Sequence, residues 1–158
     1  MAKDVDWRED NEAFGIAMKL LDKFPKIFEG LDLTKIKFVR KLGGNSTRVG
    51  EIKSCLFPFD IDSPYAYYIV IDNARWKEMS EAQRVLTVMH FIYSVAPGGT
   101  DESSKNYAHC RVHDVKDYDC VLAAAGGRYD WCNIGVTDVN NPLTMNEDAL
   151  MARMEEAR

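Results

Sequence analysis

The stretch SEAQRVLTVMHFIYSVA, residues 80–96, decides the fold. Ser80 and Gln83 have the spacing of a capping box, in which side chains satisfy backbone N–H groups at the start of a helix. From Val85 to Ala96 the stretch carries no formal charge. The cap, the length and the charged first turn outweigh the strand preference of its β-branched residues. We therefore predict a helix over 81–96 that is buried nearly all round, at the centre of the fold.

Strand patterns precede this central helix. Residues 36–40 alternate apolar and polar side chains, and residues 48–55 alternate again after a glycine-rich turn. This pattern predicts a hairpin in which the second segment pairs back on the first. Residues 66–71 lack any charge, which predicts a well-covered strand.

Helical patterns account for the rest of the chain. The pattern of residues 11–29 predicts an amphipathic helix with Asn11 as its N-cap, which Pro25 should end or kink. Residues 114–125 are expected to form a further helix. Thr144 and Glu147 have the spacing of a second capping box, which starts a short terminal helix. This order of elements predicts an α+β fold: a small antiparallel sheet packed on the central buried helix, followed by a C-terminal tail helix.

Composition and length narrow the function classes. A chain of 158 residues fits one domain, and its net charge of −5 argues against nucleic-acid binding by the whole surface. No apolar run approaches the roughly 18 residues of a membrane span, and the start lacks the apolar region of a secretory signal. The four cysteines contain no C-x-x-C pair, so we expect reduced thiols and no zinc ribbon.

Four features in sequence order resemble the phage metallopeptidase domain family, whose fold is zincin-like. They are the early helix leading into residues 36–39, the buried strand before Trp76, the capped helix at 83–86, and HDVKDY at 113–118 with Gly126, Gly127 and Trp131 downstream. The resemblance implies a zincin-like domain over residues 1–131. Residues 132–158 fall outside it and are expected to form a C-terminal extension.

The resemblance also shows what the central helix lacks. In that family this helix carries H-E-x-x-H, whose histidines bind zinc and whose glutamate acts as base for the metal-bound water. Counted from residues 83–86, these positions hold Met89, His90 and Tyr93, and a shift of one residue gives His90, Phe91 and Ser94. Neither register supplies two histidines with an acid between them. We therefore expect no peptidase chemistry and no bound cofactor.

The leading hypothesis is a phage-encoded, non-catalytic binding protein. It would act on a protein partner, as an inhibitor of a host system or a component of an assembly, in the cytoplasm of the host bacterium or on the virion. The motivation is a preserved frame around positions where the chemistry requires other residues.

One alternative is a metal-dependent hydrolase with altered ligands, for which zinc is the candidate metal. The candidate ligands are His90, His109, Cys110, His113 and Asp114, and His113 matches the H-D element of the family. Asp114 has the character of a helix cap, and a metal site needs defined geometry as well as ligand types. A chance cluster is therefore the favoured interpretation.

A second alternative is nucleic-acid binding through basic residues of the expected hairpin. These are Lys35, Lys37, Arg40, Lys41, Arg48 and Lys53, with only Glu51 opposing them. Such a patch suits phosphate contacts, yet charges also protect edge strands from aggregation. The second interpretation is favoured.

The tail offers a thin apolar stripe. Leu150, Met151 and Met154 share one side of the expected terminal helix, which is too short to be stable alone in water. We predict that Met151 and Met154 are buried against protein and that they contribute to partner binding. Deleting residues 144–158 should weaken that binding while the core domain stays folded.

Overall fold

The computed structural model describes residues 4–44, 48–55, 63–111, 119–126, 130–133, 136 and 139–156. Its strands are β1 (Asp6–Glu9), β2 (Ile36–Leu42), β3 (Gly50–Ser54) and β4 (Tyr67–Asp72). Its α-helices are α1 (Asn11–Lys23), α2 (Asn73–Glu78), α3 (Glu81–Tyr93), α4 (Asp119–Ala124) and α5 (Glu147–Glu156). Short 3₁₀ turns occupy Leu33–Lys35 and Pro142–Thr144. The expected α+β class is confirmed.

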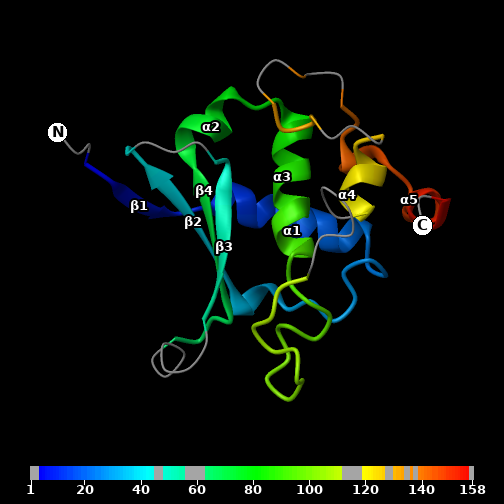
Figure 1. The fold of residues 1–158 in the computed structure, drawn as a ribbon, viewed down its shortest axis with the longest axis horizontal. Coiled ribbons are helices and arrows are strands. Elements are labelled where there is room, and N and C mark those ends of the chain that lie inside the picture. The colour runs from blue at the N-terminus through cyan, green and yellow to red at the C-terminus, as the bar shows by residue number, and fades with distance from the viewer. Residues whose placement is uncertain are drawn as a thin grey trace.

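The four strands form one mixed sheet in the order β1-β2-β4-β3 (Figure 1). The central pair, β2 and β4, is parallel, with Ile36 opposite Tyr67, whereas β1 and β3 pair antiparallel at the two edges. The expected hairpin is therefore wrong, because β3 pairs with β4 and not with β2. The expectation of a wholly antiparallel sheet is wrong for the same reason.

Burial explains this strand order. In β4 the side chains of Tyr67, Ile69 and Ile71 are all fully buried, so this strand needs neighbours on both edges and helices over one face. Strand β3 is largely exposed and suits an edge. Its first residue, Gly50, lies so close to β4 that an added Cβ would stand 2.2 Å from the carbonyl oxygen of Val70. Alternation predicted β3 and the absence of charge predicted β4, and the charge-free, buried strand is the central one.

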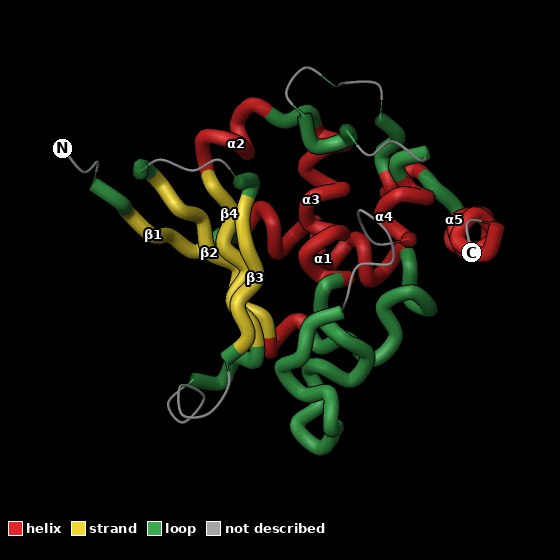
Figure 2. Tube along the Cα trace, viewed as in Figure 1, coloured by secondary structure: helices red, strands yellow, loops and turns green. Residues whose placement is uncertain are grey.

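The helices α1, α3, α4 and α5 gather on one side of the sheet, as Figure 2 shows. Helix α3 stands next to the sheet and contacts α1 and α4. Its apolar side chains supply the middle of the core, including the fully buried Leu86, Val88 and Met89. The prediction of a central buried helix is confirmed.

The ends of α3 differ from each other. At its start Ser80 and Gln83 form the predicted capping box. At its end the helix stops at Tyr93 rather than at residue 96, and the Ser94 hydroxyl donates to the carbonyl oxygen of His90 at 2.9 Å. A side chain that bonds back to the last turn competes with continuation of the helix.

Two other helix boundaries depart from the expectations. Helix α1 begins after Asp10, whose carboxylate accepts the N–H of Ala13 at 3.0 Å, so Asp10 and not Asn11 is the N-cap. It ends at Lys23, just before Pro25, so the proline ends the helix as expected and does not kink a helix that continues to residue 29. Helix α2 was not expected at all. Asp72 caps it by accepting the N–H of Arg75, and a short polar segment after a strand gave no periodic signal.

The C-terminal segment packs onto the domain. Of the helix expected at 114–125, the structure shows α4, and residues 112–118 lie outside the described residues. Helix α5 begins after Asn146, whose side chain accepts the N–H of Asp148, so Thr144 is not its cap. Glu147 instead accepts the N–H groups of Lys26 and Ile27, at 2.9 and 3.2 Å. A contact with the segment after α1 thus anchors the start of the tail helix.

The apolar stripe of α5 is docked. Leu150 is fully buried and Met154 is 8% exposed, and both belong to the core that contains α1 and α3. The burial prediction is confirmed for Met154, whereas Met151 is only partly buried. No described helix is long and apolar enough to cross a membrane.

Candidate functional site

The second half of α3 carries the positions where the resemblance places the metal-binding motif. Met89 is fully buried and Tyr93 is 8% exposed, whereas His90 is half-buried. The two side chains at the histidine positions of the first register therefore belong to the core. Neither side chain is one of the usual zinc ligands, which are Cys, His, Asp and Glu, and His90 stands where the glutamate would be.

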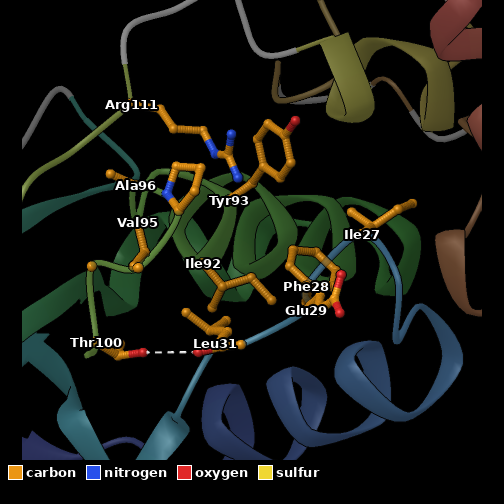
Figure 3. Close-up of a pocket in the computed structure, with 14 residues that line it drawn as sticks. Ile27, Phe28, Glu29, Leu31, Ile92, Tyr93, Val95, Ala96, Thr100 and Arg111 are labelled. Carbon is orange, nitrogen blue, oxygen red and sulfur yellow. Dashed lines mark hydrogen bonds between the residues drawn. The ribbon is translucent and has the colours of Figure 1, made fainter. Parts of the chain in front are cut away.

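Tyr93 is held between an aromatic ring and a cation. The Phe28 ring meets it edge-on with centroids 6.3 Å apart, and the Arg111 guanidinium carbon lies 4.1 Å from the Tyr93 ring centroid. Figure 3 shows the guanidinium group of Arg111 beside the Tyr93 ring. A cation over an aromatic face is attractive because the ring's π-cloud is negative. One of the protein's own positive charges thus covers the residue at the second histidine position.

The pocket beside these residues is too small for a substrate. Segments 27–31 and 95–100 line it together with Ile92, Tyr93 and Arg111 (Figure 3). It offers about 20 Å³, little more than the space of one water molecule. The Thr100 hydroxyl donates to the carbonyl oxygen of Gly30 at 3.3 Å and ties the two segments together.

The second register of the motif fails structurally as well. Phe91, at the acid position, is 7% exposed, and Ser94, at the second histidine position, is 2% exposed. The Ser94 carbonyl oxygen accepts the N–H of Arg111 at 2.7 Å, so Ser94 joins the helix end to residues 109–111. The His90 ring lies 6.3 Å from the Trp131 ring and is tilted against it. The His90 ring therefore lies beside the aromatic ring of Trp131.

The other two described candidate ligands lie beyond the end of α3. Residues 109–111 run antiparallel to residues 94–96, with a bridge between Val95 and Cys110. The His109 and Cys110 side chains are exposed, while the His109 carbonyl oxygen accepts the Tyr67 hydroxyl. Burial raises the pKa of Tyr67, so this phenol stays protonated as a donor. These contacts hold the backbone of residues 109–111 in place, whereas the His109 and Cys110 side chains remain exposed.

A metal centre is not assembled by the described part of the chain. In it, no three His, Cys, Asp or Glu side chains gather closely enough to hold an ion. His113 and Asp114 lie outside the described residues.

The predicted basic residues do not form one free patch. Lys35 pairs with Glu102 at 2.9 Å, Lys53 with Glu51 at 3.4 Å, and Lys37 with Glu9. Lys41 lies 5.9 Å from the ring centroid of Trp7, and Arg48 lines a pocket with Lys41. Nucleic-acid binding by these residues stays a prediction, and their ion pairs do not favour it.

Arg40 points away from this surface into a buried network. Its guanidinium group donates to the Asp10 carboxylate at 2.8 and 2.9 Å and lies 4.6 Å from the Trp76 ring centroid. Glu12 accepts from the Trp76 indole and pairs with Arg84, which also donates to the Trp76 carbonyl oxygen. We call Asp10, Glu12, Arg40, Trp76 and Arg84 the arginine network. It joins α1, β2, α2 and α3, which is a structural role for Arg40.

Two contributors to the site carried no usable sequence signal. Arg111 is an isolated arginine in a polar loop, and only the return of that loop along α3 places it over Tyr93. Gln83 was assigned to the cap alone, yet its amide nitrogen also donates to the carbonyl oxygens of Trp131 and Asn133, at 2.9 and 2.8 Å. These bonds fix the segment that carries Trp131 next to His90.

The fold and the site together define an α+β domain. The helix on which the resemblance places the metallopeptidase motif is α3, and its last residues belong to the core. A family model described as putative phage metallopeptidase matches residues 5–140, and the chain belongs to this family. The match extends past residue 131, where we placed the domain boundary. No curated protein and no solved structure matches the chain.

Proposed function

We propose that this protein is a non-catalytic member of the phage metallopeptidase family that acts by binding another protein. Its setting would be the host cytoplasm or the virion, where it inhibits a host system or forms part of an assembly. One observation carries the proposal: the motif positions Met89 and Tyr93 are core residues, and Arg111 covers Tyr93.

Physical chemistry supports the loss of catalysis. A zincin site needs two histidine ligands and an open coordination position for water. At these positions the protein instead holds a thioether inside the core and a phenol between Phe28 and Arg111. A zinc ion beside Tyr93 would face a fixed guanidinium charge 4.1 Å from the ring centroid. Electrostatic repulsion therefore adds to the absence of ligands.

Zinc analysis of the purified full chain tests the catalytic half of the proposal. The protein is saturated with zinc, dialysed, and analysed by mass spectrometry alongside a fluorogenic casein assay. We expect no stoichiometric zinc and no hydrolysis. One tightly held zinc per chain, with hydrolysis that chelation abolishes and zinc restores, would overturn the proposal.

Matched variants separate this proposal from a hydrolase with altered ligands. His90→Ala removes the described candidate ligand on α3, and Met89→Leu is its neighbour with no ligand chemistry. We expect the two variants to match the parent protein in zinc content. A loss of zinc confined to His90→Ala would favour the altered-ligand hydrolase.

The binding half requires a partner test in phage-infected cells. The tagged full chain is cross-linked in the cell and recovered with and without a zinc chelator. We expect a stoichiometric protein partner whose recovery is insensitive to chelation. Recovery of cleaved protein fragments alone would contradict a binding role.

A further inference from the structure

Strand β2 is longer than the strand that covers its outer edge. Strand β1 pairs with residues Val39–Leu42 of β2 and then leaves the sheet, because Asp10 starts α1. The last contact is the Asp10 N–H, which donates to the Phe38 carbonyl oxygen at 2.9 Å. Beyond it, from Ile36 to the Phe38 N–H, no described strand lies on this outer edge of β2, whose other edge is paired with β4. This is the edge opposite β3.

The ladder geometry tells which backbone groups face this open edge. The Lys35 carbonyl oxygen accepts from Ala66 on the β4 side, so alternation turns Ile36 and Phe38 toward the open edge. The Ile36 N–H is used by the Leu33 carbonyl oxygen, and among the described residues the Asp10 carbonyl oxygen accepts from the Phe14 N–H and not from the Phe38 N–H. The Ile36 carbonyl oxygen and the Phe38 N–H therefore remain for an added strand.

A pocket lies directly beside these two groups. It lies between β2 and α1, has a volume of about 320 Å³, and its apolar lining comes from Phe14, Leu33, Ile36 and Phe38. Phe14 and Leu33 are only partly buried, so apolar surface is open to a ligand. Cavities of roughly 300–1,000 Å³ are typical of binding pockets. The space accommodates an aliphatic or aromatic side chain.

The polar rim adds no net charge. Glu9 and Lys37 line the pocket and pair with each other. The pairing lowers the pKa of Glu9 and raises that of Lys37, so both stay charged and cancel at neutral pH. A ligand for this pocket thus needs an uncharged apolar side chain and a backbone that offers both a donor and an acceptor.

We propose that the open edge of β2 binds an extended segment of a partner protein as a short added strand. The segment donates an N–H to the Ile36 carbonyl oxygen, accepts the Phe38 N–H, and places an apolar side chain against Phe14 and Leu33. This is strand addition, in which backbone bonds give affinity and a side-chain pocket gives specificity. It rests on the proposed binding role and names the kind of partner surface that serves it.

A partner's free segment fits this edge better than a second copy of the chain does. Only Ile36–Phe38 is open, whereas strands usually pair over about five residues. The start of α1 also flanks the edge, since Asp10 and Asn11 line the same pocket. A narrow extended segment can enter there, while the edge of a second folded sheet would meet the helix.

The test uses the full chain and the blocked peptide acetyl-Thr-Val-Leu-Val-Thr-amide, whose central leucine suits the pocket. Binding is followed by the backbone amide signals of the labelled protein. We expect the Phe38 amide to shift and to exchange more slowly with solvent. Shifts confined to other regions, or no binding at millimolar peptide, would overturn the proposal. An equal shift on raising the protein concentration alone would indicate a second copy instead.

An N-methyl scan of the peptide tests the strand pairing. Methylating the one amide that donates to the Ile36 carbonyl oxygen removes a main-chain hydrogen bond and should weaken binding by about tenfold. Methylating the other amides should leave affinity nearly unchanged. Sensitivity must therefore be confined to a single position of the peptide. A uniform response would contradict strand addition.

Protein variants test the pocket. Asn11→Trp places a large ring at its mouth on an exposed position of α1, and the control Lys77→Trp adds the same ring on exposed α2. We expect at least a tenfold loss of peptide binding for the first variant alone, with equal thermal stability for both. Equal binding by both variants would overturn the proposed location.

The outcomes separate this inference from the proposed function. Peptide that binds at Phe38 and is also cleaved by a zinc-loaded chain would contradict the non-catalytic role and leave the edge site intact. Failure of the peptide to bind a chain that also lacks zinc would remove the edge site and leave the non-catalytic role intact.

Discussion

The two ends of α3 are built on different principles. At its start the arginine network joins four elements through charged hydrogen bonds, and Gln83 adds bonds to the segment at 131–133. At its end Met89, Phe91 and Tyr93 are packed by apolar contacts, with Arg111 stacked on the last ring.

This difference separates what holds the fold from what performs the family's chemistry. Directional polar bonds at the start of α3 tolerate little change where they involve Asp10 and Gln83, because these side chains are buried and a lost partner leaves a buried polar group unsatisfied. Apolar positions at the end tolerate change when volume and burial are kept. Residues at the motif positions can therefore lose their ligand chemistry while the frame of the domain persists.

The largest expected effect is at the start of α3, in the arginine network. Arg40→Leu leaves the Asp10 carboxylate, whose side chain is 2% exposed, without its main partner. We expect the free energy of unfolding to fall by about 3–5 kcal/mol, measured by urea denaturation. Arg8→Leu is the control, because Arg8 pairs with Asp6 at an exposed site, and should cost at most about 0.5 kcal/mol. Similar losses of stability for Arg40→Leu and Arg8→Leu would contradict the proposed difference between the two ends of α3.

Gln83→Ala should have the next largest effect. It removes the reciprocal half of the capping box and two hydrogen bonds to the carbonyl oxygens of Trp131 and Asn133. We expect a loss of about 1–3 kcal/mol in thermal or urea unfolding, together with a changed environment of Trp131 in tryptophan fluorescence. Glu81→Ala, in the same first turn but exposed, serves as the control. A fluorescence spectrum identical to that of the parent would show that Gln83 does not position this segment.

Arg111→Leu probes the other end of α3 and should cost less. It removes the cation over Tyr93, a contact worth about 0.5–2 kcal/mol. Lys105→Leu, an exposed change in the same loop, should leave the unfolding midpoint unchanged. A loss as large as that of Arg40→Leu would mean that both ends depend equally on charge.

The smallest effect concerns the exposed pair of Glu9 and Lys37. The pair lowers the pKa of Glu9 below its usual 4.5, so its contribution is present above that pH and is lost as pH falls through the lowered value. Unfolding midpoints of the parent and of Lys37→Met should therefore differ slightly at pH 7 and converge at acid pH. A difference that grows on acidification would contradict this sign.

The sequence predicted the parts of the fold that depend on local patterns. The capping box of Ser80 and Gln83, the buried helix and the strand expected at residues 66–71 are set by spacing and composition, and the structure confirms them, with the strand at Tyr67–Asp72. Partner choice between strands was not predictable in this way. The alternation in residues 48–55 marks a strand but says nothing about whether β2 or β4 lies beside it.

The candidate site was predictable only where the residue type at a position is enough to judge its chemistry. The missing motif follows from the residue types at positions 89, 90 and 93. The cover of Tyr93 by Arg111, and the turn of Arg40 toward Asp10, depend on long-range packing that spacing does not encode. Successive side chains alternate between the two faces of a strand, so Arg40 lies on the opposite face of β2 from Lys37 and Lys41, and the run of basic residues overstates the charge of either face.

The order of the strands also has a consequence for how the sheet forms while the chain is being synthesised. Residues 50–54 leave the ribosome before residues 67–72, yet β3 pairs only with β4. The earlier strand must therefore wait, unpaired, until the later one has been made. The connection from Ser54 to Tyr67 is shorter than the connection from Leu42 to Tyr67, so closing it costs less chain entropy. Strands β3 and β4 can thus pair with each other before β4 docks on β2, although β2 is made first.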